Sequence, residues 1–114
     1  MSSEELAVLL DWDALFSAPT IVLVGDPLSG IFSVYDHIRK KNPNGVVSVF
    51  HDRNTIPMIE KADVIIEIQQ KVSGNRVQRI FIIQKWKGHD IPSIMIPFII
   101  KAERIELDTK ERVV

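Results

Sequence analysis

The chain has 114 residues, of which 46% are hydrophobic and 25% are charged, and its formal net charge is -1. This size and composition predict a single globular domain and exclude a chain that is disordered throughout. The near-zero charge provides no general attraction for nucleic acid, and the absence of cysteine excludes disulfides and thiolate metal sites.

Neither a metal site nor a membrane segment is expected. The three histidines, His37, His51 and His89, are far apart in the sequence and show no ligand spacing. No apolar run approaches the roughly 20 residues that span a bilayer, and the acidic N-terminus does not resemble a signal peptide. We therefore expect a cytoplasmic protein without membrane contact.

The first half of the chain alternates helices and strands. Residues 3–17 are expected to form a helix, because a capping box begins at Ser2 and leucines follow at helical intervals. Residues 20–24 and 46–50 are short apolar runs, typical of strands buried on both faces of a parallel sheet. A second helix over residues 29–41, with three basic residues in its last turn, joins them.

The second half is rich in isoleucine and changes to a period of two, which favours strands. After one short helical turn, strands are predicted over residues 63–71, 77–87, 94–101 and 105–108, with a hairpin turn at residues 73–75. Alternation along the strand places Ile80, Ile82, Gln84 and Trp86 on one face and Phe81, Ile83, Lys85 and Lys87 on the other. The short helical turn is expected over residues 55–61.

These elements predict an α/β fold with a small mixed sheet. Two parallel strands joined by a crossover helix lead into an antiparallel meander. Residues 1–114 form one domain, in which residues 1–19 hold the N-terminal helix, residues 20–108 the core sheet and residues 109–114 a frayed tail.

The loop over residues 25–30 is the first candidate site. Gly25 and Gly30 have the spacing of a phosphate-binding loop, but isoleucine and phenylalanine follow where lysine and a hydroxyl residue are needed. Gly25, Asp26, Ser29 and Gly30 would then bind a nucleotide or anion only weakly. Alternatively, Asp26 ends an apolar strand as a Walker B acid does, or the loop is only a tight strand-to-helix turn.

The second candidate is the run Lys-Trp-Lys-Gly-His at residues 85–89. A period of two places the Lys85 and Lys87 ammonium groups on one face, about 6.5–7 Å apart along the strand, where they could meet a polyphosphate. A solvated strand end is the alternative interpretation. His51 and Asp52 follow a strand end and are interpreted as a loop pair, because adjacent residues on a strand point to opposite faces.

Five segments occur in a familiar order. They are the strand at 62–68, the Ser-Gly-Asn turn, the strand at 79–89 that ends in Lys-Trp-Lys-Gly-His, the Pro-Phe strand at 96–100 and the strand at 105–107. Together they resemble the C-terminal part of the RecA-like ATPases of the KaiC/RadA type, over at least residues 46–108. The likeness extends back to Thr20 if the strand that ends at Asp26 carries the Walker B acid.

The resemblance implies a partial RecA-like fold and a particular role for the two lysines. In these ATPases the nucleotide lies between subunits, and a Lys-x-Arg pair reaches the neighbour's γ-phosphate. Lys85 falls on the lysine and Lys87 on the arginine, where lysine keeps the charge but loses the bidentate fork. Without an intact phosphate loop or catalytic glutamate, the resemblance implies a protein that is not an enzyme, with ATP and magnesium present only if shared with a partner.

Three functions are compatible with the sequence. The first is a non-catalytic, truncated ATPase-like domain that forms a homo-dimer or a hetero-complex with an intact RecA-like or KaiC-like ATPase, because a shortened sheet leaves an edge to be covered. The second is weak nucleotide or anion binding by the 25–30 loop. The third is a recombinase-paralog-like DNA accessory, although the net charge argues against it; its candidate residues are Arg76, Arg79, Lys85, Lys87 and residues 39–41.

Overall fold

In a computed structural model of the chain, the described residues are 12–52, 61–88, 95–101 and 104–107. Most of the helix expected over residues 3–17, most of the turn expected over residues 55–61 and the expected tail at 109–114 lie outside these ranges. In chain order the elements are α2 (Trp12–Phe16), β1 (Thr20–Gly25), the 3-10 turn η1 (Pro27–Ser29), α3 (Ile31–Lys41), β2 (Val46–Phe50), β3 (Val64–Ser73), β4 (Arg76–Trp86), β5 (Met95–Lys101) and β6 (Arg104–Leu107).

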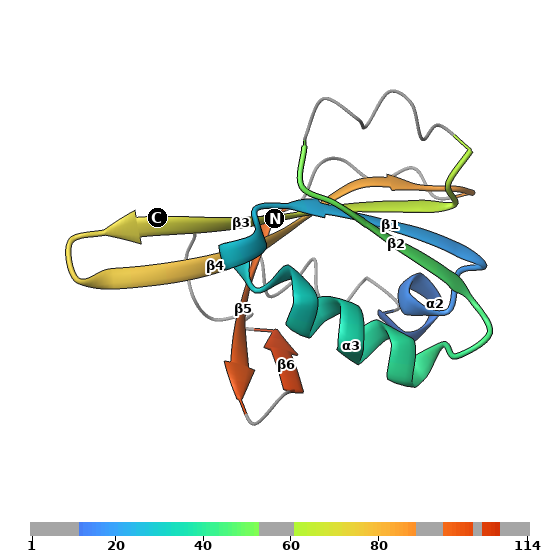
Figure 1. Ribbon diagram of the computed structural model, residues 1–114, viewed down its shortest axis with the longest axis horizontal. Helices are drawn as coiled ribbons and strands as arrows, with labels where there is room; N and C mark the ends of the chain where they lie inside the picture. The colour runs from blue at the N-terminus through green and yellow to red at the C-terminus, as the bar shows by residue number, and fades with distance from the viewer. Residues whose placement is uncertain (1–11, 53–60, 89–94, 102–103, 108–114) are drawn as a thin grey trace.

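A mixed sheet of six strands joins the described parts, in the order β2-β1-β3-β4-β5-β6. β1 pairs in parallel with β2 on one side and with β3 on the other, and β3 to β6 form an antiparallel meander. The expected combination of parallel strands, a crossover helix and a meander is therefore confirmed. Figure 1 shows α2 and α3 on one face of this sheet, with β5 and β6 turned toward the same side.

α3 covers the centre of the sheet because its apolar residues recur on one face. Ile31, Val34 and Ile38 are fully buried and belong to the main core cluster with Phe81 of β4. The helix ends at Lys41 and is capped by Asn42, whose backbone N–H donates to the Ile38 carbonyl oxygen. In the described ranges, no helix is long and apolar enough to cross a membrane.

β2 is an edge strand, which corrects the expectation that residues 46–50 would be buried on both faces. Val46 is exposed, and the other four residues are only partly buried. Val47 and Val49 pack against the main core cluster, and Phe50 packs against a smaller cluster on the opposite face. An apolar run alone could not distinguish this edge position from a central one. β1, with residues 21–25 all buried, has a strand on each side, as predicted for residues 20–24.

A β-bulge at Gln84 breaks the alternation that the sequence predicted in β4, because the register with β3 shifts there. Trp86 consequently lies with Phe81 and Ile83 in the main core cluster under α3, and not with the isoleucines of the opposite face as predicted. Lys85 moves to that opposite face, since it pairs directly with Ile65, which belongs to the smaller cluster there. The bulge therefore changes which side of the sheet carries the basic end of β4.

Candidate functional site

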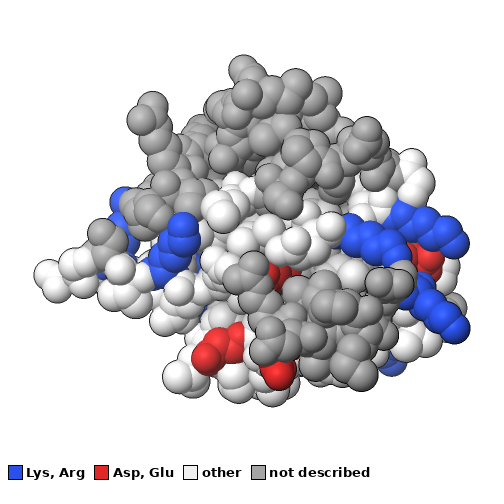
Figure 2. All heavy atoms as spheres, turned by 90° about the horizontal axis from the view of Figure 1, so that it is seen from above, with Lys and Arg blue, Asp and Glu red and all other residues white. Residues whose placement is uncertain are grey.

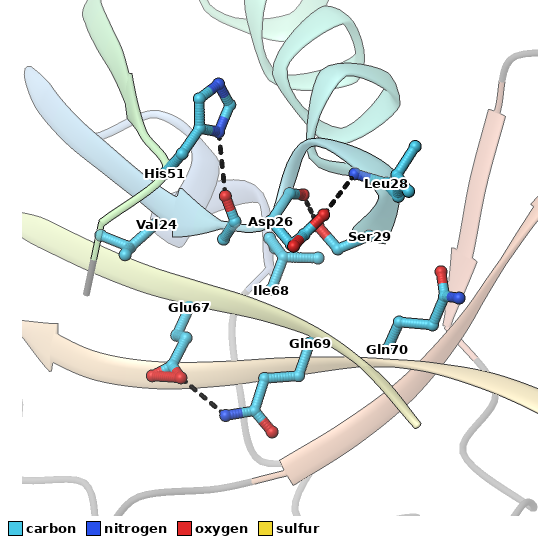
Figure 3. Close-up of a pocket in the computed structure, with 10 residues that line it drawn as sticks. Val24, Asp26, Leu28, Ser29, His51, Glu67, Ile68, Gln69 and Gln70 are labelled. Carbon is cyan, nitrogen blue, oxygen red and sulfur yellow. Dashed lines mark hydrogen bonds between the residues drawn. The ribbon is translucent and has the colours of Figure 1, made fainter. Parts of the chain in front are cut away.

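A hollow of about 500 Å³ lies where β1 and β2 end beside β3. β1 leads to β2 on one side while β3 lies on the other, and ligands of open α/β sheets bind at such a reversal of strand order. Figure 3 shows the residues around it, which come from the end of β1, from η1 and the Asp26 before it, from His51 just after β2, and from the middle of β3. The described lining residues are Val24, Gly25, Asp26, Leu28, Ser29, His51, Glu67, Ile68, Gln69 and Gln70.

The 25–30 loop lies at this hollow, between a buried strand and a helix, as the phosphate-loop interpretation requires. Two of its backbone donors, however, are already bonded. The Leu28 N–H donates to Asp26 Oδ1 at 2.9 Å, and the Ser29 N–H donates to the Asp26 carbonyl oxygen at 3.0 Å. The Ser29 hydroxyl donates to the same carbonyl oxygen at 2.6 Å. Asp26 therefore takes up two of the N–H groups that a phosphate cradle would need for its anion.

The two glycines of this loop are explained by close packing. A Cβ on Gly25 would lie 2.6 Å from the Ile68 carbonyl oxygen, so only glycine lets β1 approach β3 here. Gly30 has a φ of 92°, and a Cβ there would lie 2.8 Å from Ile100 Cδ1. The turn into α3 thus needs both glycines whether or not a ligand binds.

His51 belongs to the hollow, which the sequence did not indicate. Its Nδ1 donates to the Gly25 carbonyl oxygen at 2.9 Å, and its ring meets the Phe32 ring edge-on at 5.6 Å between centroids. With Nδ1 as the donor, the neutral imidazole keeps Nε2 as an acceptor. The predicted loop position after β2 is correct, but the contacts of His51 described here are with the end of β1 and with α3.

Glu67 is the clearest residue that sequence reasoning missed. Its side chain is only 3% exposed, and its two carboxylate oxygens accept hydrogen bonds from Gln69 Nε2 at 2.6 Å and Gln84 Nε2 at 3.1 Å. The Glu67–Gln69 contact is drawn in Figure 3. The sequence signal was a single acid inside the apolar run of residues 64–68.

The chemistry of the hollow does not favour phosphate. Asp26 and Glu67 contribute carboxylates, and none of the ten described lining residues is lysine or arginine. Hydroxyl, amide and imidazole groups complete the lining, so the walls suit hydrogen-bonding or positively charged groups better than an anion. Among the residues in the described ranges, no group of three or more His, Cys, Asp or Glu side chains could hold a metal ion.

Lys85 and Lys87 lie at the opposite end of the sheet from this hollow. The Lys87 N–H donates to the Asp63 carbonyl oxygen at 2.8 Å, and Lys87 Nζ is 3.9 Å from Asp63 Oδ1 with 76% of the side chain exposed. At the hollow, Gly25 pairs with Ile68. Ile68 is five residues after Asp63 along the chain, so roughly 16 Å of strand separates Lys87 from the hollow. Within one chain, the two sequence-predicted groups therefore form separate surfaces.

The candidate DNA-contacting residues are not brought together either. Residues 39–41 lie in the last turn of α3, where Arg39 Nη1 donates to the Gly45 carbonyl oxygen at 2.8 Å. Arg76 and Arg79 lie on β4 near the β3–β4 turn. Figure 2, in which the molecule is seen from above, shows Lys and Arg side chains at both ends of this face, with acidic side chains between them and beside the basic ones at one end. This arrangement is not a continuous basic face.

Comparison with known proteins does not assign a family. A scan against protein-family models finds no match, and a search of curated proteins finds no significant match. The likeness to the RecA-like ATPases therefore rests on the five sequence segments alone.

Proposed function

We propose that this chain is a non-catalytic binding module that works by protein association, and that the tip of the β3–β4 hairpin is its main contact surface. The observation that carries the proposal is a two-stranded ribbon, residues 71–78, that extends beyond the rest of the sheet. β1 stops pairing with β3 at Ile68, and β5 starts pairing with β4 at Arg79. Figure 1 shows this hairpin projecting from the body of the molecule.

The ribbon carries apolar surface that the described fold does not cover. Val72 and Val77 face each other across the hairpin, with 67% and 49% of their side chains exposed. A hairpin without a third strand is only marginally stable in water, so a ribbon of this kind gains from a partner. Exposed valines on such an element favour a protein contact over a purely structural role.

The RecA-like resemblance makes an intact ATPase of that class our candidate partner. The succession of parallel strands and an antiparallel meander supports a partial RecA-like fold, and the exposed Lys87 supports a contact in trans with a neighbour's phosphate. The association is expected to regulate or complete the partner's assembly.

Nucleotide binding by the chain alone has less support, because Asp26 takes up the Leu28 and Ser29 N–H groups. Isothermal calorimetry with ATP and magnesium at millimolar concentration separates the two functions. Association predicts no heat from nucleotide alone, whereas measurable heat would favour the 25–30 loop as a binding site.

A site-specific photo-cross-linker tests the association. Placed at Val77 in cells of the source organism, it should yield a discrete adduct, whereas the same group at the exposed Asn44, on the α3–β2 loop, should not. Sedimentation velocity of the pure protein then tells whether the adduct is a second copy. A monomer at high concentration that gives no adduct from Val77 would contradict the proposal.

A further inference from the structure

β3 runs past the end of β1 and presents a backbone edge. The last pair between the two strands joins Gly25 to Ile68, yet β3 continues to Ser73. On the side of β1, no strand in the described ranges pairs with β3 residues 69–73. The position next to these residues, which a longer β1 would fill, thus holds no strand of the described ranges.

The hairpin turn determines which groups of this edge point outward. Residues 74–75 form a two-residue turn, and Ser73 pairs with Arg76 across it. In such a hairpin, the two residues that flank the turn direct their N–H and C=O groups at each other. Every second residue of β3, counted from Ser73, therefore points its backbone groups at β4, and the residues between them point theirs away.

Gln70 and Val72 are the outward-facing residues of the edge. Ile68 has the same orientation, and its carbonyl oxygen does point toward Gly25 of β1. Gln70 and Val72 thus offer two N–H donors and two C=O acceptors in the spacing that an antiparallel strand uses. Val72 also adds an exposed apolar side chain on the face that α3 covers further along the sheet.

The hollow provides room next to this edge. Ile68, Gln69 and Gln70 form one of its walls, and Leu28 and Ser29 of η1 form another. Leu28 is 81% exposed. A strand laid along Gln70 and Val72 would enter the hollow at one end and lie beside Leu28 there.

Charge argues against a second copy as the occupant. A two-fold pairing that uses both outward residues joins Gln70 of one copy to Val72 of the other, and this register sets Lys71 directly opposite Lys71 of the second copy. Like charges in that position destabilise a strand pair, and edge lysines are a known device against self-pairing. The sequence between Ile68 and Gly88 contains no Asp or Glu that could offset this repulsion.

We propose that this edge of β3 accepts an extended segment of a partner protein as an additional antiparallel strand, with an acidic side chain opposite Lys71. Main-chain hydrogen bonds to Gln70 and Val72 supply the affinity, and Lys71 selects the acid. The segment must be neutral or basic at its other end, where Asp26 lines the hollow. This inference rests on the proposed association function and names the form that the partner's contact takes.

Val72→Pro is the matched test, because the Val72 N–H points away from β4 and proline removes it without removing a β3–β4 hydrogen bond. Val72→Thr is the control, since it keeps the N–H and the branched side chain. The probe is a capped peptide of about eight residues, alternating valine and threonine around one central glutamate. Titration followed by amide NMR should shift the Gln70 and Val72 signals, with binding about tenfold weaker for Val72→Pro and unchanged for Val72→Thr.

A charge exchange tests the role of Lys71. The Lys71→Glu variant should bind the glutamate peptide about fivefold more weakly than the same peptide with lysine at its centre, the reverse of the native preference. A glutamate peptide with methylated backbone nitrogens should not bind the native protein, and this result remains decisive if Val72→Pro does not fold.

Equal binding of the glutamate peptide to Val72→Pro and Val72→Thr would overturn strand addition, as would no binding to the native protein at millimolar peptide. A duplex DNA oligonucleotide that shifts the same amides at lower concentration would instead make the edge part of a nucleic-acid surface. A Val77 adduct that persists in the Val72→Pro protein would overturn strand addition while leaving association through the ribbon intact. Loss of that adduct only in Val72→Pro, and not in Val72→Thr, would support both.

Discussion

Replacing Gly25 by alanine should destabilise the protein strongly, because packing against β3 requires glycine there. The new Cβ would lie 2.6 Å from the Ile68 carbonyl oxygen, so two paired strands must separate, at a cost of about 3 kcal/mol. Gly30→Ala should cost about 2 kcal/mol, since its φ is 92° and its Cβ meets the flexible end of Ile100. Gly74→Ala isolates the backbone effect at about 1 kcal/mol, because φ is 60° and no atom lies within 4 Å of the added methyl.

Urea titrations of the native protein and the three variants at pH 7 measure these differences in the free energy of unfolding. The expected order of destabilisation is Gly25→Ala, then Gly30→Ala, then Gly74→Ala, with an unchanged dependence on urea concentration. In a thermal scan, Gly25→Ala should lower Tm by roughly 10 °C. If Gly25→Ala proves no more destabilising than Gly74→Ala, the close approach of β1 to β3 does not explain Gly25, and a ligand-binding reason for this glycine would regain support.

Three further predictions concern pH, nucleotide and the basic end of β4. Burial, followed by the nearby Lys41 and Lys40 ammonium groups, lowers the pKa of His37, so the unfolded chain takes up the proton more readily than the folded one. The free energy of unfolding should therefore fall as pH drops below about 6.5, and His37→Phe should lose this component in urea titrations at pH 7.5 and 5.5. Millimolar ATP with magnesium should leave the Tm of the pure protein unchanged. A clear rise in Tm would contradict the conclusion that Asp26 takes up the N–H groups that the 25–30 loop needs to bind a nucleotide. With a RecA-like ATPase that binds this protein, the Lys85→Ala, Lys87→Ala double variant should lower the stimulated ATPase rate but not the amount bound; an unchanged rate would exclude the action in trans.

The strands were predictable because β-branched residues and a period of two mark them locally. Residues 46–50 form a strand with the predicted bounds, and residues 77–87 differ from β4 by one residue at each end. The turn predicted at residues 73–75 lies at residues 74–75, because Ser73 still pairs with Arg76 as the last residue of β3. The crossover helix ended at Lys41 as predicted, but it begins at Ile31, because Pro27–Ser29 form a separate 3-10 turn capped by Asp26. These features could be predicted because each depends mainly on residues that are close together in the sequence.

Register and neighbours were not predictable in the same way. The bulge at Gln84 depends on how β4 meets β3, and a single-strand pattern does not contain that information. The wrong orientation of Trp86 followed directly from assuming unbroken alternation. The edge position of β2 has the same origin, because an apolar run shows that a strand is covered but not how many strands flank it.

The candidate site shows this limit most clearly. Asp26 and Ser29 were identified from a loop motif, but Glu67 comes from β3 and His51 follows the end of β2, so both meet the loop only through the strand order β2-β1-β3. Glu67 attracted no attention because an acid within an apolar run has no motif of its own. Its burial between the Gln69 and Gln84 amides is a property of the assembled sheet.

The unequal lengths of the strands connect the fold to the proposed function. β3 and β4 have 10 and 11 residues, whereas their neighbours β1 and β5 have 6 and 7, so the hairpin must extend beyond the sheet. Past Ile68 the sequence of β3 becomes polar except for Val72, which suits a solvated ribbon. Contact between Val72 and Val77 stabilises the hairpin by roughly 0.2–1 kcal/mol, and a threonine pair would do nearly the same without exposing apolar surface. Val72, the outward backbone groups and Lys71, which has no ion-pair partner among the described residues, thus lie together on the edge of β3, and a partner strand uses all three.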